Sequence, residues 1–195
     1  MRRAKIDRQT RETTISIELN IDGAGDSDIQ SGIGFFRHML ETFARHGCFD
    51  ISARISGDVV VDQHHTVEDT GLVLGKAFKQ ALGEKKGINR AGFFFYPMDD
   101  ALAMSAIDLS GRPYLIFDAP FQVQKVGEFD TELVQDFFQG FATSLKANLH
   151  IKLFYGRNAH HCIEAIFKSV ARALKAACEI DPRNKDIVPS TKGVL

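Results

Sequence analysis

The sequence lacks the features that mark secreted and membrane-spanning proteins. It has no tryptophan, and its three cysteines, Cys48, Cys162 and Cys178, are odd in number and irregularly spaced, which speaks against a disulfide framework. No run of about 18 apolar residues is present, so no membrane span is predicted. The charged N-terminal segment has no apolar centre and does not resemble a secretory signal. We therefore expect a cytoplasmic protein with no role at a membrane.

Net charge is also nearly absent. The 24 Lys and Arg residues against 25 Asp and Glu residues give a formal charge of −1, and a nucleic-acid-binding domain usually carries a basic excess. Nucleic acid is therefore not an expected partner, and recognition of an anion must depend on a few placed residues. A hydrophobic content of 44% in 195 residues is enough for one core, in one domain or in two small ones packed together.

The spacing of apolar residues predicts alternating strands and helices. Period-two alternation and short apolar runs predict strands at 14–21, 49–55, 92–97, 101–109, 113–119 and 149–155. Helical spacing predicts helices at 35–47, 64–82, 131–145 and 159–179. Residues 22–32, rich in Gly, Asp and Ser, are predicted to be a loop.

The chain contains an internal repeat. The segment from His38 to Glu68 matches the segment from Asp136 to Glu164, with offsets of 98 (136 − 38) and 96 (164 − 68) that a two-residue gap reconciles. This predicts an α/β (α+β) fold with two pseudo-symmetric strand–helix–strand–helix halves, about 1–90 and 91–195. We expect the halves to form a single compact unit over 1–195, with the sheets beside each other and the helices packed on one face.

The repeat contains a doubled His-His-x-x-Glu motif, His64-His65-Thr-Val-Glu68 and His160-His161-Cys-Ile-Glu164. Residues four apart share a helix face, so each first histidine can meet a cation together with its glutamate. Adjacent residues diverge by about 100°, so the second histidines should serve the ion of the opposite helix. The prediction is one ion at His64, Glu68 and His161, and a second at His160, Glu164 and His65. Chance placement of His and Glu on a surface helix is the alternative, and it is much weaker for two matching copies.

Other residues are weaker candidates. His38 and Asp136 occupy equivalent repeat positions, and either could complete a cation site from a neighbouring element or another subunit. His46 ends a helix, where a cationic cap is the ordinary structural explanation. Cys162 is expected in the core, and His150 in the core or behind the site. Phosphate-type recognition is suggested by Arg90, Arg112, Ser190 and Lys192, and Glu12 precedes the first predicted strand.

Several motifs together resemble a known family. They are Gly34-Phe-Phe-Arg-His-Met-Leu, Asp62-Gln-His-His-Thr-Val-Glu-Asp69, Asp108-Leu-Ser-Gly-Arg-Pro-Tyr114, Gly156-Arg-Asn-Ala-His-His-Cys-Ile-Glu-Ala165 and Pro189-Ser-Thr-Lys-Gly193. In this order, over nearly the whole chain, they resemble the signatures of the imidazoleglycerol-phosphate dehydratases.

The resemblance implies a hydro-lyase of histidine biosynthesis that converts imidazoleglycerol phosphate to imidazoleacetol phosphate. It also implies a repeated fold similar to the second domain of ribosomal protein S5, and two divalent cations per active site, with Mn(II) the favoured ion. These ions would lie at subunit contacts in a 24-subunit shell built from trimers. The implied metal ligands are His38, His64, His65, Glu68, His160, His161 and Glu164. The implied substrate contacts are Glu12, His46, Arg90, Arg112, Ser190 and Lys192.

The chain departs from the family at Asp136, where the family commonly has histidine. A carboxylate can still ligate manganese, so Asp136 is kept as a metal-ligand candidate with a possible shift in metal preference. Glu12, Glu68 and Glu164 are the catalytic candidates. Glu12 or Glu164 is the expected base, and Glu68 is the weaker one.

Two further interpretations are compatible with the same residues. A dinuclear metal-dependent phosphoester hydrolase would use the same ions and basic residues, and would not need an imidazole ring in its substrate. A module in which the ions only join subunits is disfavoured by the phosphate-type residues near the tail.

Overall fold

The computed structural model describes residues 1–193, and the buried side chains of both halves belong to one hydrophobic core. The core is rich in phenylalanine, and Phe43, Phe78, Phe137 and Phe141 are fully buried with their rings in contact. The organisation as a single unit over 1–195 stays a prediction, and its last two residues lie outside the described part.

The first half contains one four-stranded sheet and two helices. Its elements are β1 (Arg3–Gln9), β2 (Thr13–Asn20), β3 (Ser27–Ser31), α1 (Gly34–Gly47), β4 (Asp50–Gly57) and α2 (His64–Leu82). The strand order is β1-β2-β4-β3, in which β3 pairs parallel with β4 and the other pairs are antiparallel.

The second half repeats this plan. Its elements are β5 (Ala91–Met98), β6 (Ala101–Asp108), β7 (Tyr114–Asp118), β8 (Lys125–Val126), β9 (Phe129–Asp130), α3 (Leu133–Leu145), β10 (Asn148–Tyr155) and α4 (Ala159–Cys178). The sheet order is β5-β6-β10-β7, again with a single parallel pair, β7 with β10. Substituting β5, β6, β7 and β10 for β1, β2, β3 and β4 converts one sheet order into the other, which confirms the duplicated halves.

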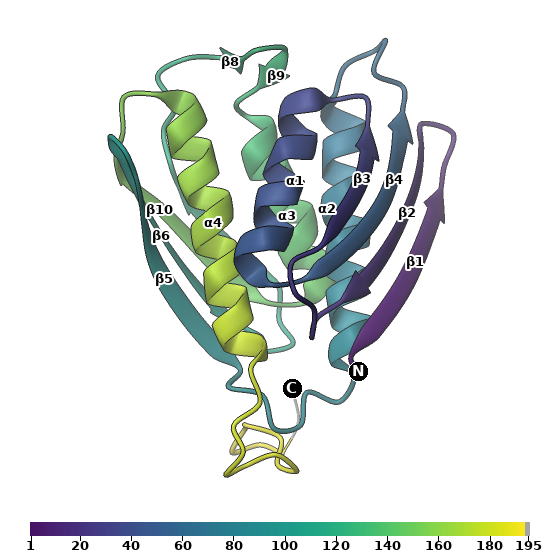
Figure 1. The fold of residues 1–195 in the computed structure, drawn as a ribbon, viewed down its shortest axis with the longest axis vertical. Coiled ribbons are helices and arrows are strands. Elements are labelled where there is room, and N and C mark those ends of the chain that lie inside the picture. The colour runs from purple at the N-terminus through teal and green to yellow at the C-terminus, as the bar shows by residue number, and fades with distance from the viewer. Residues whose placement is uncertain (194–195) are drawn as a thin grey trace.

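The four helices lie between the two sheets, which form the outer layers (Figure 1). Each sheet therefore carries helices on one face, as expected, but the two sheets do not adjoin. The helices α1 and α2 pack on the first sheet, α4 packs on the second, and the helix layers meet through α2 with α3 and α1 with α4. Within residues 1–193, no helix has both the length and the apolarity required to cross a bilayer.

The contact between α2 and α3 is unusually close because glycines line it. A Cβ atom added at Gly71 would lie 2.2 Å from the carbonyl oxygen of Phe137, and one added at Gly140 would lie 2.7 Å from the carbonyl oxygen of Glu68. Contacts this short cannot accommodate any side chain, so the glycines let the helix backbones approach. The N-terminal parts of α2 and α3 are thereby brought together.

Three short strand regions differ from the sequence predictions. Residues 22–32 are not all loop, because Ser27–Ser31 forms β3, and Arg3–Gln9 forms β1, where no strand was predicted. A small hairpin, β8 with β9, precedes α3. The first half thus has three strands before its first helix, whereas the prediction gave it one, and the second half has three strands of its main sheet and the hairpin before α3.

Candidate active site

The N-terminal ends of α2 and α4, which carry the doubled histidine motif, lie at one end of the molecule, at the top of Figure 1. On α4, Asn158 caps the helix by accepting a hydrogen bond from the backbone N–H of His160. On α2, Asp62 accepts the equivalent bond from His64. These caps fix the first turn of each helix, so the motif side chains project from defined positions. We call this region the histidine end.

One cluster, called the first triad, consists of His38 from α1 with His160 and Glu164 from α4. The Oε2 atom of Glu164 lies 3.2 Å from Nε2 of His160 and 3.6 Å from Nε2 of His38. One ligand atom from each residue lies within 4.8 Å of the other two. Glu164 is 7% exposed, whereas both imidazoles are partly exposed, so the cluster opens to solvent on its histidine side.

Lys168 lies behind the first triad. Its Nζ atom is 2.6 Å from Oε1 of Glu164, leaving Oε2 to face the histidines. Burial by itself raises the pKa of Glu164, but the hydrogen bond and charge of Lys168, together with the nearby histidines, hold that pKa below its usual value. Glu164 is therefore a stable anion and a weak proton acceptor.

The second triad is the pseudo-symmetric counterpart, made of His64 and Glu68 from α2 with Asp136 from α3. Asp136 Oδ2 lies 3.3 Å from Nδ1 of His64, and Glu68 Oε2 lies 3.8 Å from its Nε2. His64 thus turns different ring nitrogens toward the two carboxylates, so the three ligand atoms do not converge as they do in the first triad. Asp136 occupies the place that His38 has in the first triad, which supports completion of each cluster by an adjacent helix.

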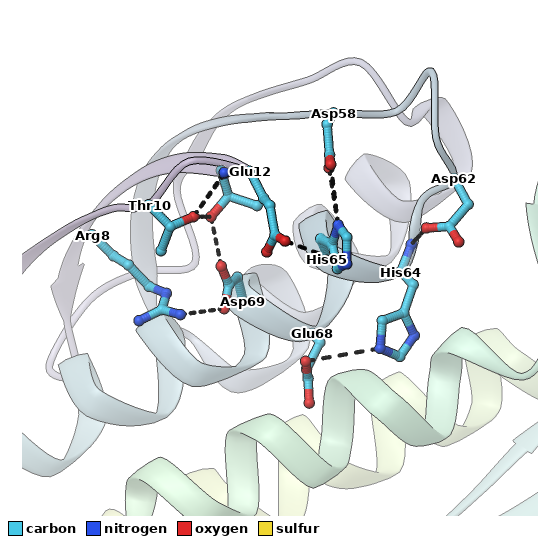
Figure 2. A network of polar contacts seen from close by, with 10 residues as sticks. Arg8, Thr10, Glu12, Asp58, Asp62, His64, His65, Glu68 and Asp69 are labelled. Carbon is cyan, nitrogen blue, oxygen red and sulfur yellow. Dashed lines mark hydrogen bonds and ion pairs between the residues drawn. The ribbon is translucent and has the colours of Figure 1, made fainter.

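The second histidine of each motif faces a different set of carboxylates. Figure 2 shows His65 directed at Asp58 and Glu12, with its Nδ1 3.2 Å from Asp58 and its Nε2 3.9 Å from Glu12. The hydrogen bond to Asp58 raises the pKa of His65. On α4, Nδ1 of His161 lies 2.6 Å from Asp100, and the pKa of that carboxyl falls well below its usual range because of this bond and two backbone N–H donors.

Glu12 and Asp100 are equivalent in the repeat, since each stands immediately before the second strand of its half. Within this subunit, His65 and His161 contact these carboxylates and belong to neither triad. The predicted sharing of each ion with the second histidine of the opposite helix therefore requires another copy of the chain, and it stays a prediction.

The phosphate-type candidates gather elsewhere. Arg90 donates to both oxygens of Asp108 at 2.7 and 3.1 Å, and to the carbonyl of Pro189 at 2.9 Å. This last bond holds the tail segment with Ser190 and Lys192 beside Arg90. Arg112 lies in the turn after β6, and its carbonyl accepts from Asn148 at 2.7 Å. We call this region, with Arg90, Arg112, Ser190 and Lys192, the arginine end.

The arginine end and the histidine end lie at opposite ends of the second sheet. Arg90 precedes β5, where Ala91 pairs with Asp108, and the β5–β6 turn that contains Asp100 closes the other end of the same hairpin. The eight residues of β5 span about 25 Å at roughly 3.3 Å per residue. A small phosphate ester cannot reach from one end to the other, so one subunit does not bring the two residue sets together.

His46 lies in the last turn of α1 and contacts the second sheet. Its Nδ1 atom is 3.4 Å from the hydroxyl of Tyr96. Burial first, and then the positive charges of Lys168 and Arg172, lower the pKa of His46. The lowered pKa disfavours the charged imidazolium, which argues against the cationic helix cap considered from the sequence.

Two further sequence predictions concern isolated side chains. Cys162 is buried, as expected. His150 was expected in the core or behind the site, and this was wrong, because β10 turns it to the exposed outer face of the sheet.

The donor set of the triads suits a divalent transition metal. Imidazole nitrogens and carboxylate oxygens with no thiolate are the ligands expected for Mn, Fe, Co, Ni or Zn. The spacing in the first triad, 3.2 to 3.6 Å between donor atoms, fits ligands that share an ion at about 2.0–2.2 Å. The first triad therefore fits a cation as it stands, and the second triad offers donors of the same types, which would converge on a cation only after His64 turns.

Sequence reasoning missed several residues of the histidine end. Lys168 was not singled out, although a lysine four residues after Glu164 on a helix is a usual sign of an ion pair. Asp58 and Asp100 were also missed, because loop positions do not show which helix they face. Asp62, next to the motif, has a recognisable local signal as a helix cap.

Comparison with known proteins defines the class of this protein as a hydro-lyase. The family model described as imidazoleglycerol-phosphate dehydratase matches residues 31–174. Curated dehydratases of that name from Koribacter versatilis and Cereibacter sphaeroides are 56% and 54% identical over 195 residues, covering 100% of both chains in each comparison.

Solved structures of imidazoleglycerol-phosphate dehydratases share the fold. The Staphylococcus aureus enzyme gives a TM-score of 0.83 at 38% identity, covering 92% of this chain and 99% of its own. The Pyrococcus furiosus enzyme gives 0.85 at 35% identity, covering 97% and 100%. The chain belongs to the imidazoleglycerol-phosphate dehydratase family, the hydro-lyases that remove water from imidazoleglycerol phosphate in histidine biosynthesis.

Proposed function

We propose that the dehydration performed by this chain depends on two divalent cations, with Mn(II) as the resident ion, held at the first and second triads. The observation that carries the proposal is the pair of pseudo-symmetric triads at one end of the fold. One of them already has its donor atoms within 4.8 Å of one another. Bound there, the cations supply Lewis acidity to a substrate imidazole, whose ring must accept electrons as the carbon-bound proton leaves.

The active site is built from more than one copy of the chain. This follows from the separation of the histidine end and the arginine end, because a substrate with both a ring and a phosphate needs both residue sets. Arg90, Arg112, Ser190 and Lys192 of one copy bind the phosphate, while the triads of another copy face the ring. Arginine and lysine donors suit a phosphate dianion, and fixing it orients the reacting carbon atoms.

The outer face of the second sheet supports self-association. Phe93, Phe95, Tyr114, Ile116 and Phe154 are between 42% and 69% exposed on it, whereas ion pairs such as Lys5 with Glu18 and Arg54 with Asp28 occupy the first sheet. An exposed aromatic face of this kind marks a protein–protein contact. We assign it to contacts between copies, in a shell of 24 subunits built from trimers in the cytoplasm, with no nucleic acid as partner.

Glu12 is the base that removes the carbon-bound proton. Its carboxylate is about half exposed, and its only side-chain partner within 4 Å among the described residues is His65, at 3.9 Å. Glu164 is a poorer base because Lys168 stabilises its anion, and Glu68 is committed to the second triad. In this scheme Asp58 fixes the orientation of His65, which lies beside Glu12.

The test is an assay with imidazoleglycerol phosphate that follows imidazoleacetol phosphate. Turnover should disappear after chelation and dialysis and return with manganese chloride. Full turnover in chelated protein that is free of metal by elemental analysis would contradict the metal dependence. A phosphoester hydrolase would instead release inorganic phosphate from a generic phosphate ester that has no imidazole.

Shared sites are tested by mixing two inactive variants, Glu12→Gln at the histidine end and Arg112→Gln at the arginine end. If each site combines the ends of two copies, random co-assembly leaves about a quarter of the sites with both ends intact. Activity should therefore return on mixing after disassembly and reassembly. A mixture that stays inactive despite co-assembly would contradict the shared site.

A further inference from the structure

The repeat places two triads at equivalent positions, but their chemistry differs. The first triad offers two imidazoles and one carboxylate, and the second offers one imidazole and two carboxylates, since Asp136 stands where the first has His38. A duplicated fold therefore presents two ions with different donor sets.

The charge around the triads increases this difference. Lys168 lies 2.6 Å from Glu164, so one carboxylate and one ammonium group sum to zero beside the first triad. The residue equivalent to Lys168, at an offset of 96, is Leu72, which brings no charge. Glu68 and Asp136 sum to −2, and among the described residues no Lys or Arg lies within 4 Å of either.

Lys168 also limits how Glu164 can bind an ion. Because Oε1 is engaged by Nζ, only Oε2 faces the histidines. Both oxygens of Glu68 are without a lysine partner, so Glu68 can present either or both. The second triad is thus the harder, more oxygen-rich site.

Donor type decides which cation each triad selects. Carboxylate oxygens suit manganese, whereas imidazoles favour later metals such as zinc, which most N-donor sites bind more tightly than manganese. Resting on the proposed function, we propose that the two triads differ in metal selectivity: zinc displaces manganese readily from the first triad and with difficulty from the second. When both ions are present, the protein holds a mixed pair, with manganese at the Asp136 triad.

Two further effects do not remove the difference in metal preference between the triads. The rearrangement of His64 needed to close the second triad weakens binding of either ion equally, so it does not alter the preference between them. An imidazole supplied to each triad by the second histidine of another copy adds one nitrogen to both sites. The contrast between His38 and Asp136 therefore persists in the assembled protein.

The experiment is a zinc titration of the full, manganese-loaded protein. Free Mn(II) is followed by its electron paramagnetic resonance signal, and bound metal by elemental analysis. Manganese should leave in two steps whose midpoints differ by at least about tenfold in zinc concentration, corresponding to about 1.4 kcal/mol. Asp136→His should move the later step down toward the earlier one, so that the interval between the two midpoints becomes smaller.

The matched control is His38→Asp, which gives the first triad the donor set of the second and should move the earlier step up. Asp136→Asn, which keeps the side-chain shape and loses the charge, shows whether the later step depends on the carboxylate. A single step in the unaltered protein, or two unchanged steps in folded Asp136→His, would overturn the inference while leaving two bound ions and the proposed function in place. Protein that retains no manganese before zinc is added would overturn both.

Discussion

Lys168 and Glu164 form an ion pair of 2.6 Å in which each side chain is only about one-tenth exposed. A buried ion pair depends on both partners, and removing one leaves the other charged and unpaired at a cost of about 3–5 kcal/mol. In this protein one partner also lies in the first triad. The Glu164 carboxylate therefore contributes both to folding stability and to cation binding. The two contributions can be separated experimentally.

Glu164→Gln should lower the free energy of unfolding by about 3–5 kcal/mol and abolish turnover, since it leaves Lys168 unpaired and removes a ligand of the first triad. Adding Lys168→Met should restore most of the stability without restoring metal binding or activity. Denaturant unfolding and metal analysis measure the two effects, with Glu41→Gln as control, because Glu41 is partly exposed and lies on α1 outside the triads. Full activity of Glu164→Gln would contradict the proposed coordination.

Gly71→Ala should separate α2 from α3, because its new methyl group meets the carbonyl oxygen of Phe137 at 2.2 Å. Overpacking of this kind costs roughly 1–3 kcal/mol or more. The same shift moves Asp136 away from His64, so the second triad should lose manganese before the first. The control is Gly32→Ala, where an added Cβ meets nothing within 4 Å. Equal melting temperatures for the two variants would show that the helix contact is not tight.

Arg90→Gln should reduce kcat/KM at least tenfold, mainly through KM, because it removes a charged donor and releases the tail from its bond to the Pro189 carbonyl. Proteolysis of the tail should also become faster. Arg183→Gln is a matched control, since Arg183 lies on the same tail and is exposed beside Asp181. Unchanged kinetics in Arg90→Gln would remove Arg90 from the phosphate site.

His46 should make the folded state less stable in acid. Its folded pKa is lowered by burial and by Lys168 and Arg172, so below about 6.5 the unfolded chain takes up a proton that the folded chain resists. This penalty is absent at pH 8, grows as the pH falls through 6.5, and is complete below the folded pKa. His46→Gln should therefore lose less stability than the unaltered protein between pH 7.5 and 5.5, as measured by urea unfolding. An equal loss in both would contradict the shift.

Strong periodicity made much of the fold predictable. The helix over 64–82 was predicted with the observed bounds of α2, because its apolar residues recur at helical spacing between a motif and Gly83. The edge strand β3 was missed because, in Ser-Asp-Ile-Gln-Ser, only Ile29 is apolar and buried. β1 was missed because charged residues outnumber the two that it buries, Ala4 and Ile6. Such strands are specified by pairing with neighbours, which local sequence does not record.

The candidate site was predictable in its parts and not in its arrangement. The doubled motif identified the pairs His64 with Glu68 and His160 with Glu164, since helix geometry fixes residues four apart. His38 and Asp136 complete the triads because of the way in which α1 packs on α4 and α3 packs on α2. The distance of about 25 Å between the arginine end and the histidine end is set by the length of the β5–β6 hairpin. These are properties of tertiary packing.

The separation of the histidine end from the arginine end makes activity depend on association between copies of the chain. If each copy gives its histidine end to one site and its arginine end to another, a single damaged subunit silences two reaction centres. Dilution below the association threshold would then extinguish turnover while every chain remained folded. The rate of turnover would then depend on the concentration of the protein as much as on the folding of each chain.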